Sequence, residues 1–519
     1  MKIEVTGSGP LEVEASVLAI PVFEGDPADA RGLFAEMDRR LDGHLAAAAS
    51  EEDFQGKAGQ VLQLRTLGRL RAGRLLLVGL GKRDEAKRNL PRSGFETLRV
   101  AAGDAARTAQ KGGATRLAFA CPRLPGQTAH EARAVVEGAL LGAYRFDRYK
   151  TEERKKKAPP RLESLAVIVP QGLERSREVK EAVALARTVS SAVAWARDRV
   201  NEPPLHLTPS RLADAARELA KEAGLHAEVL GPREIASLRM GMFLGVTRGS
   251  AEEPRLVKIS WVPRGAAGKK PPVVVVGKAI TFDSGGLSLK PTEGMVDMKT
   301  DMAGAAAAVA AMKVVAELEP PFPVHALVGA CENMPGGRAY KPSDILIARN
   351  GKTVEITNTD AEGRLVLGDV LAWGVETLKP AMIVDLATLT GACVVALGMT
   401  TVGAFGPDGP AMEAVLSAAR AAGEDTWRLP LTDSVKEELK SDVADLKNAG
   451  TRMGGSISAA WFLKEFVGDA PWVHLDIAGP SSTTKEKGYV AKGGTGVGVR
   501  TLVELVRARA QDDARPPRR

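Results

Sequence analysis

Histidine and cysteine are scarce in this chain of 519 residues, and their scarcity excludes several kinds of site. None of the six histidines lies in the two charged segments described below, so neither a Ser-His-Asp relay nor a histidine-rich zinc site is expected there. The three cysteines, Cys121, Cys331 and Cys393, stand in apolar contexts without CxxC spacing. This pattern indicates buried thiols in a reducing compartment, and we therefore expect a cytoplasmic protein.

Long apolar runs are also missing. No run approaches the roughly 18 residues that a membrane helix needs, so no membrane partner is expected. The start of the chain, Met1 to Val5, is typical of a strand rather than of a signal peptide. Aromatic residues reach only 4%, but 44% hydrophobic and 26% charged residues are ordinary for a globular protein. A chain of this length predicts two domains.

A strong excess of positive charge is absent too, since the net charge is only +7. The densest basic cluster, Arg154 to Lys157, is followed by Pro159 and Pro160, and no aromatic residues interleave it as base stacking would require. We interpret this cluster as a solvated linker. Nucleic-acid binding through such basic patches is kept as the alternative function, with salt-sensitive binding as its test.

Residues 1–172 are expected to form an N-terminal α/β domain, because strand-like and helix-like segments alternate there. The pair Gly79 and Gly81 follows a strand but lacks the third glycine of a dinucleotide fingerprint. A nucleotide- or phosphate-sensing module is therefore disfavoured. Strands are predicted at 17–22, 61–65, 75–78, 117–121 and 165–169, and helices near 28–49, 92–111 and 129–143.

A linking helix is predicted within residues 173–200, where apolar residues recur at helical spacing before Pro203. The second domain is expected at 201–519, with a disordered tail from about residue 508. Alternating segments favour an α/β/α doubly wound sheet, and the small residues at 303–308 indicate close helix packing. Strands are predicted at 255–262, 273–277, 324–331, 382–387 and 473–477, and helices at 210–223, 304–318, 363–378, 411–422 and 456–466.

The segment Asn358-Thr359-Asp360-Ala361-Glu362-Gly363-Arg364-Leu365 crowds two carboxylates and a guanidinium around one glycine. Asp360 alone could cap the helix that follows. In an extended or turn conformation, however, Asp360 and Glu362 point the same way, and converging carboxylates are costly unless a cation joins them. Gly363 allows the backbone to approach another group closely. The segment therefore predicts a cation site.

A second charged segment, from Lys278 to Asp301, follows the buried-strand pattern at 273–277. Ligands in open α/β sheets bind beyond the carboxyl ends of parallel strands, where Lys278 and Asp283 are expected to fall. The two segments together supply four carboxylates, two lysines and an arginine. Because clustered carboxylates repel one another, a two-metal site is predicted. Oxygen ligands suit Mg²⁺, Mn²⁺ and, less selectively, Zn²⁺.

These segments resemble the leucyl aminopeptidases, a cytosolic family of two-metal exopeptidases. All eight letters of the family signature stand at 358–365, and the Val-Gly-Lys…Thr-Phe-Asp-Ser-Gly-Gly…Met-Lys-x-Asp-Met block is intact at 276–302. Residues 386–392 and 472–479 resemble two further blocks, so the resemblance covers roughly 200–500. The N-terminal region matches loosely and would be macro-like. The resemblance implies a metal-dependent aminopeptidase, assembled as a homohexamer, that removes N-terminal residues, preferably Leu and other apolar ones, from peptides.

The resemblance also implies a set of metal ligands for two divalent ions, Mn²⁺ or Zn²⁺. Asp283 and Glu362 would bridge the ions, Asp360 would complete one site, and Lys278 and Asp301 the other. A lysine ligand must be neutral, and we expect burial and a bound cation to lower the pKa of Lys278. A bridging water would then attack the scissile carbonyl, while Asp301 binds the free α-amine of the substrate.

The remaining site residues implied by the resemblance are catalytic groups and a substrate pocket. Lys290 would stabilise the developing oxyanion. Arg364 would hold a bicarbonate that acts as general base, since a guanidinium matches a planar oxyanion. The substrate pocket would be formed by Met298, Thr388, Leu389 and Gly391, with the Leu389 carbonyl contacting the substrate backbone.

Overall fold

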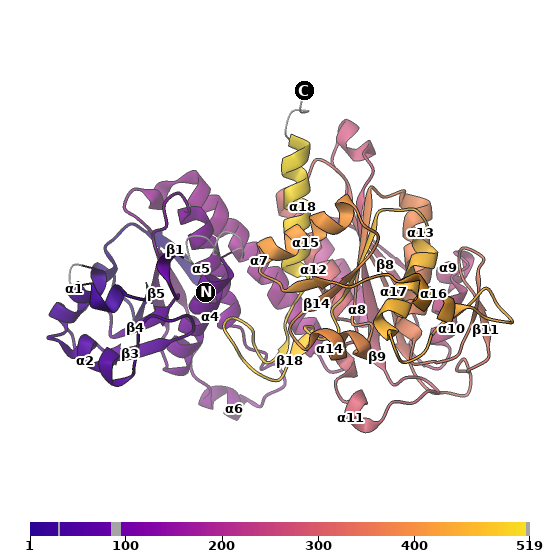
Figure 1. Cartoon of the computed structure of the whole chain (residues 1–519), viewed down its shortest axis with the longest axis horizontal. Helices are drawn as coiled ribbons and strands as arrows, with labels where there is room; N and C mark the ends of the chain where they lie inside the picture. The colour runs from indigo at the N-terminus through magenta and orange to yellow at the C-terminus, as the bar shows by residue number, and fades with distance from the viewer. Residues whose placement is uncertain (30–31, 85–94, 515–519) are drawn as a thin grey trace. The chain divides into compact units, whose positions relative to one another are not determined.

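The computed structural model describes residues 1–29, 32–84 and 95–514, and it divides into two compact units (Figure 1). The first unit comprises Met1–Ser191 with Lys485–Lys492, and the second comprises Ala192–Thr484 with Gly493–Arg519. The change between units falls within helix α7 (Arg177–Asn201), in the segment where a linking helix is expected. Residues 30–31 and 92–94, which two of the predicted helices include, lie outside the described residues.

The first unit is built on a six-stranded sheet in the order β1-β6-β5-β2-β4-β3. All neighbouring strands are parallel except β3 and β4. Apolar residues of α4, α5 and α7 cover one face, and those of α1 and α2 cover the other. The strands are β1 (Lys2–Thr6), β2 (Val17–Val22), β3 (Val61–Arg65), β4 (Arg74–Gly79), β5 (Arg116–Ala120) and β6 (Ser164–Ile168). The helices are α1 (Leu33–Arg40), α2 (His44–Glu51), α4 (Glu96–Lys111), α5 (Thr128–Gly142) and α6 (Glu152–Lys157).

The second unit is built on an eight-stranded sheet in the order β15-β14-β17-β13-β9-β10-β8-β7. Its centre, from β17 to β10, is parallel, while β8, β7 and β14 pair antiparallel to their inner neighbours. The α/β architecture expected for both parts of the chain is confirmed. The strands are β7 (His226–Leu230), β8 (Arg255–Trp261), β9 (Val273–Asp283), β10 (Val324–Asn333), β13 (Met382–Ala387), β14 (Val402–Phe405), β15 (Thr426–Arg428) and β17 (Trp472–Asp476).

Helices cover both faces of this sheet. Helices α8 (Pro209–Glu222) and α12 (Ala303–Leu318) pack on one face, with α18 (Val499–Ala514) against α12 and α15 (Pro410–Ala422) against α18. Helices α10 (Gly241–Thr247) and α13 (Glu362–Leu378) pack on the other, with α17 (Gly455–Val467) outside α13. In Figure 1, α12, α15 and α18 lie on one side of the strands, and α10, α13 and α17 lie on the other. Since both faces are covered, the central strands are continuous apolar runs.

The run of small residues at the start of α12 allows that helix to lie close to the sheet. A Cβ at Gly304 would overlap the Leu386 carbonyl of β13, and a Cβ at Gly277 of β9 would overlap Ala305. The expectation of close helix packing at 303–308 is therefore confirmed. This contact brings the residues before α12, including Asp301, near the end of β9.

Two expectations about the second unit are wrong. Strand β9 does not end at Gly277, because its pairing with β10 continues to Ile280 and resumes at Asp283 opposite Asn333. Lys278 and Asp283 therefore lie within the strand rather than beyond it. The disordered tail expected from about residue 508 is also wrong as far as Ala514, where α18 ends. The last five residues of the chain lie outside the described residues.

Candidate metal centre

Lys278, Asp301 and Glu362 meet at the centre of the second unit. Lys278 projects from β9, Asp301 follows a short 3₁₀ turn, and Glu362 opens α13. The Lys278 Nζ lies 2.8 Å from Asp301 Oδ2 and 2.9 Å from Glu362 Oε1. These side chains are 4%, 5% and 1% exposed, so water screens the three charges only weakly.

Lys290, Asp283 and Asp360 form a second group beside the first. The Lys290 Nζ lies 2.9 Å from Asp283 Oδ2 and 2.5 Å from Asp360 Oδ1. Carboxylate oxygens of Asp283, Asp301 and Glu362 all lie within 4.8 Å of one another, so Asp283 joins the two groups. The structure thus brings together all four predicted carboxylates and both predicted lysines.

The pKa values at this centre reflect burial and the crowding of negative charge. Burial, together with Asp283, raises the pKa of both Asp301 and Glu362 above the ordinary range. Burial alone would lower the pKa of Lys278, but Asp301, Glu362 and Asp283 outweigh it and raise that pKa. Burial thus acts in the expected direction, but the neighbouring carboxylates stabilise the buried ammonium and outweigh it. Only a bound cation would make this amine a neutral ligand.

Asp360 is not the N-cap of the helix that follows it. Ala361 occupies the cap position of α13, and no side chain caps the helix there. The Asp360 carboxylate instead contacts Lys290, while its backbone N–H donates to the Asn358 side chain at 2.9 Å. The simple capping interpretation is excluded, and the carboxylate faces the charged cluster.

The backbone of α13 passes close to Lys278 at Gly363. A Cβ built at this glycine would overlap the Cε and Nζ atoms of Lys278. Only a residue without a side chain lets the first turn of α13 pass Lys278 at this distance. This is the close approach that the glycine of the signature predicts.

Arg364 is buried on the same turn of α13. Its Nη1 donates to the Asn448 carbonyl at 3.0 Å, and its Nε has no hydrogen-bond partner among the described residues. Burial lowers the pKa of Arg364 to about 10, although Glu362, Asp476 and Asp360 oppose this shift. A buried guanidinium with an unused N–H can bind a planar oxyanion.

One of the predicted substrate-pocket residues, Thr388, touches the charged cluster. Its Oγ1 donates to Asp301 Oδ1 at 2.9 Å, and its carbonyl accepts from Lys278 Nζ at 3.1 Å. Leu389 follows it and is half-buried. Gly391 begins α14 (Gly391–Leu397), and a Cβ there would meet no atom within 4 Å. Met298 is half-buried on the 3₁₀ turn that leads to Asp301.

Three polar residues that sequence reasoning missed support the carboxylates. The Asn333 amide donates to Asp283 Oδ1 at 2.8 Å and to the Thr359 carbonyl at 3.0 Å. Thr359 Oγ1 donates to the Gly285 carbonyl at 2.7 Å, and Tyr340 donates to the Thr359 carbonyl, also at 2.7 Å. These bonds join the two charged segments. The only signal for Asn333 in the sequence is a polar residue ending a buried strand.

The donor set fits divalent cations. It offers four carboxylates and one amine, all of them buried except the half-buried Asp360, and Glu362 Oε2 has no hydrogen-bond partner among the described residues. Carboxylate oxygens are the ligands that Mn²⁺ and Mg²⁺ prefer, and Zn²⁺ also accepts them. The cluster therefore has both the charge and the free ligand atoms that two cations require.

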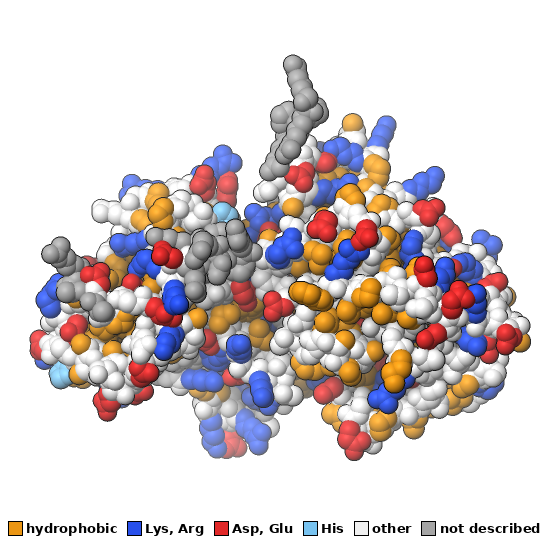
Figure 2. All heavy atoms as spheres, viewed as in Figure 1, with side chains coloured by type: hydrophobic (Ala, Val, Ile, Leu, Met, Phe, Trp, Pro, Cys, Tyr) orange, Lys and Arg blue, Asp and Glu red, His pale blue; other side chains and the backbone are white. Residues whose placement is uncertain are grey.

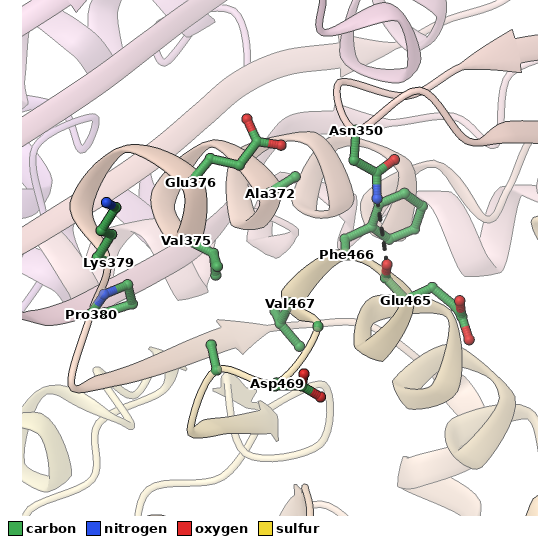
Figure 3. Close-up of a pocket in the computed structure, with 12 residues that line it drawn as sticks. Asn350, Ala372, Val375, Glu376, Lys379, Pro380, Glu465, Phe466, Val467 and Asp469 are labelled. Atoms are coloured by element: carbon green, nitrogen blue, oxygen red, sulfur yellow. Dashed lines mark hydrogen bonds between the residues drawn. The ribbon is translucent and has the colours of Figure 1, made fainter.

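Two cavities of the second unit lie away from this centre. One of about 530 Å³ lies between the ends of α13 and α17, as Figure 3 shows. A second, of about 790 Å³, is lined by residues of α15 and α18 among others. Neither includes a predicted site residue. Cavity size alone therefore does not identify the candidate site.

Within the part of the chain that the structure describes, the ion pairs of the basic cluster do not support the nucleic-acid alternative. Lys155 and Lys157 of the basic cluster pair with Glu152 and Glu153 on the same helix, α6. On the face shown in Figure 2, basic and acidic side chains are interspersed over most of the surface, while basic ones gather over α6. Among the described residues, no helix is both long and apolar enough to cross a membrane.

Two family models match the chain. The model of the "Cytosol aminopeptidase family, catalytic domain" matches residues 194–503, and that of the family's N-terminal domain matches residues 19–153. A "Probable cytosol aminopeptidase" of Geobacter sp. (strain M21) is 46% identical over 509 residues, covering 98% of this chain and 100% of the relative. That of Alkaliphilus oremlandii (strain OhILAs) is 43% identical, covering 98% and 99%.

Solved structures agree with these matches. A mutant of tomato leucine aminopeptidase is 35% identical with a TM-score of 0.87, covering 98% of this chain and 96% of that one. The bottromycin maturation enzyme BotP in complex with Mn is 38% identical with a TM-score of 0.81, covering 96% and 100%.

Proposed function

Since the chain belongs to the cytosol aminopeptidase family and is a metal-dependent aminopeptidase, we propose that its five clustered residues hold two divalent cations. The ligands would be Lys278, Asp283, Asp301, Asp360 and Glu362. The observation that carries this proposal is the meeting of Asp283, Asp301 and Glu362, whose carboxylate oxygens lie within 4.8 Å of one another. The two lysines offset only part of the charge of the four carboxylates, and bound cations would compensate the rest.

The ions, when bound, would lower the pKa of a water molecule and polarise the scissile carbonyl. The chain's own residues then orient the substrate. Asp301 can accept a hydrogen bond from the substrate's free α-amine, because it lies at the edge of the cluster beside Thr388. Binding the amine would place the first peptide bond of the substrate at the centre, which would explain why the enzyme removes only the N-terminal residue.

Lys290 and Arg364 are the proposed catalytic groups. Lys290 is only 17% exposed, and its ammonium can donate to the oxygen of the scissile carbonyl as negative charge develops there. Arg364 has a buried Nε without a hydrogen-bond partner among the described residues, in the turn of α13 that Glu362 opens, and bicarbonate would fit it as a planar oxyanion. Arg364 would hold such a bicarbonate, which would supply a general base at the centre.

The finer assignments are proposals of the same kind. We favour Mn²⁺, because the ligands are mainly oxygens and one similar solved structure is a complex with Mn, with Zn²⁺ as the second choice. The substrates would be peptides that begin with Leu or another apolar residue, bound near Met298 and Gly391. A homohexamer follows from the family resemblance. A cytoplasmic location follows from the buried cysteines and from relatives named cytosol aminopeptidases.

Paired substrates test the recognition of the free amine. Leu-amide should be hydrolysed, whereas N-acetyl-Leu-amide should not, because the acetylated nitrogen has neither a charge nor an available lone pair. Initial rates of both should be measured with the same Mn²⁺-loaded enzyme. Comparable turnover of the two substrates would remove the role proposed for Asp301 and the explanation of exopeptidase action.

A further inference from the structure

Asp476 belongs to a segment, residues 472–479, to which the proposed reaction assigns no role. It ends β17, opposite Ala387 at the end of β13, and its side chain is fully buried. The backbone continues this pairing, since the Ile477 N–H donates to the Ala387 carbonyl at 2.8 Å. The loop that follows β13, residues 388–390, therefore starts directly beside the Asp476 carboxylate.

The Asp476 carboxylate binds this loop at two successive residues. Its Oδ1 accepts from the Leu389 N–H at 3.2 Å, and its Oδ2 accepts from the Thr390 hydroxyl at 2.7 Å. The same hydroxyl accepts from the Cys393 N–H at 3.0 Å and so caps α14. Asp476 thus ties the loop to the helix that continues from it.

The other side of the loop is tied to the candidate metal centre. Lys278 Nζ donates to the Thr388 carbonyl at 3.1 Å. That carbonyl and the Leu389 N–H belong to one planar peptide unit, so this unit is held at both of its polar ends. Thr390 is fixed in addition by its own hydroxyl.

These hydrogen bonds fix the direction of the Leu389 carbonyl, because the peptide unit before it and the Thr390 side chain after it are both hydrogen-bonded. A carbonyl can only accept hydrogen bonds. Of the substrate donors near the first peptide bond, the free amine is assigned to Asp301. The family resemblance implies that the Leu389 carbonyl contacts the substrate backbone, and the N–H of the scissile bond is the donor that remains for it.

We propose that Asp476 is a positioning residue for the aminopeptidase reaction, which holds the loop at 388–390 so that the Leu389 carbonyl accepts the scissile N–H of the substrate. This inference rests on the proposed function and adds a residue to it. Asp476 itself contacts neither the substrate nor the ions. Its effect should therefore depend on whether the substrate has that N–H.

An ester analogue isolates this contact. In a peptide such as Leu-Gly the scissile bond carries an N–H, whereas in the depsipeptide with glycolic acid in place of glycine it does not. Asp476→Asn should lower kcat/KM for Leu-Gly by about tenfold, and for the ester by less than about threefold. Metal content should stay at the wild-type level, because no ligand changes.

Further variants keep the test independent of folding. Thr390→Val removes the hydroxyl that Asp476 binds. Like Asp476→Asn, it should lower the ratio of kcat/KM for the amide to kcat/KM for the ester, and Thr390→Ser should keep the wild-type ratio. Asp369→Asn is the matched control, since Asp369 is also a buried carboxylate that accepts backbone N–H groups, those of Phe243 and Arg349. It should change stability without changing the ratio.

The inference would be overturned if Asp476→Asn and Thr390→Val both kept the wild-type amide-to-ester ratio of kcat/KM. Equal losses on both substrates would then show a structural role only, and no loss on either would show no role in the reaction. Failure of the proposed function is a separate outcome, because the wild-type enzyme would then leave Leu-Gly intact or would cleave its N-acetylated form.

Discussion

At the scale of single residues, Gly363 shows how a backbone position controls the charged cluster. A side chain there would overlap the Lys278 Cε and Nζ. Gly363→Ala should therefore displace Lys278 from Asp301 and Glu362, and both metal content and kcat should fall together. Elemental analysis and initial rates check this. Gly337→Ala is the control, since a Cβ at Gly337 meets no atom within 4 Å. Full metal content in Gly363→Ala would contradict the proposed ligand role of Lys278.

Lys290 separates catalysis from metal binding. Its ammonium lies between Asp283 and Asp360, so Lys290→Met leaves both carboxylates in place. Metal content should be retained, while kcat should fall roughly a hundredfold, equivalent to about 3 kcal/mol of lost oxyanion stabilisation. Lys299→Met, which removes only a bond to the Asn201 carbonyl, should remain active. Loss of metal, or an unchanged kcat, would show that Lys290 does not have the proposed role.

The sequence predicts the residues of this centre well where several charged residues are close together in the chain, and poorly where a polar residue is isolated. Asp360 and Glu362 stand out because two carboxylates beside an apolar helix are costly without a cation. Asn333 and Asp476 do not stand out in this way, since a single polar residue at the end of a strand is common. Their importance depends on neighbours far away in the chain, such as Thr359 and Leu389.

At the scale of elements, the pairing of β8 with β10 carries a pH-dependent group. His325 is opposite Ser260, and its Nδ1 lies 2.8 Å from the Ser260 hydroxyl. Burial, with a smaller effect of Lys258, lowers the pKa of His325 from 6.5 to about 4. The unfolded chain binds a proton below about pH 6.5 that the folded chain does not bind until about pH 4. The free energy of unfolding should therefore fall as the pH is lowered through this window.

His325→Gln removes this contribution. The wild type should lose about 3 kcal/mol from this residue between pH 7 and pH 4, and the variant should lack that part of the loss. Urea unfolding at several pH values measures it. His226→Gln, at an exposed position on β7, is the control. Identical pH profiles for the wild type and His325→Gln would contradict the assignment.

Element prediction succeeded for long apolar segments and failed for short or polar ones. Strand β13 (Met382–Ala387) has its predicted bounds, because a short, continuous run of apolar residues is typical of a strand buried on both faces. Strand β9 is longer than predicted, since Lys278 looks like the end of a strand in the sequence but pairs with Gly329 of β10. Edge strands β7 and β15 were missed, because their half-exposed residues carry no clear period.

At the scale of the whole molecule, cation binding should be coupled to stability. A ligand that binds only the folded chain raises its free energy of unfolding, by about 2.7 kcal/mol at a hundred times its Kd. Mn²⁺ should therefore raise the melting temperature, and a chelator should lower it and abolish activity. Glu362→Gln, which alters the most deeply buried carboxylate of the cluster, should greatly reduce this shift. An equal shift in the variant would place the stabilising cation elsewhere.

The location of the cations in a crystal tests the central proposal most directly. Crystals grown with Mn²⁺ should give two anomalous-scattering peaks in each chain, both among Lys278, Asp283, Asp301, Asp360 and Glu362. Crystals of Glu362→Gln should lose one or both peaks. Anomalous peaks outside this cluster, or an active Mn²⁺-loaded enzyme with no peak inside it, would contradict the proposed two-metal centre.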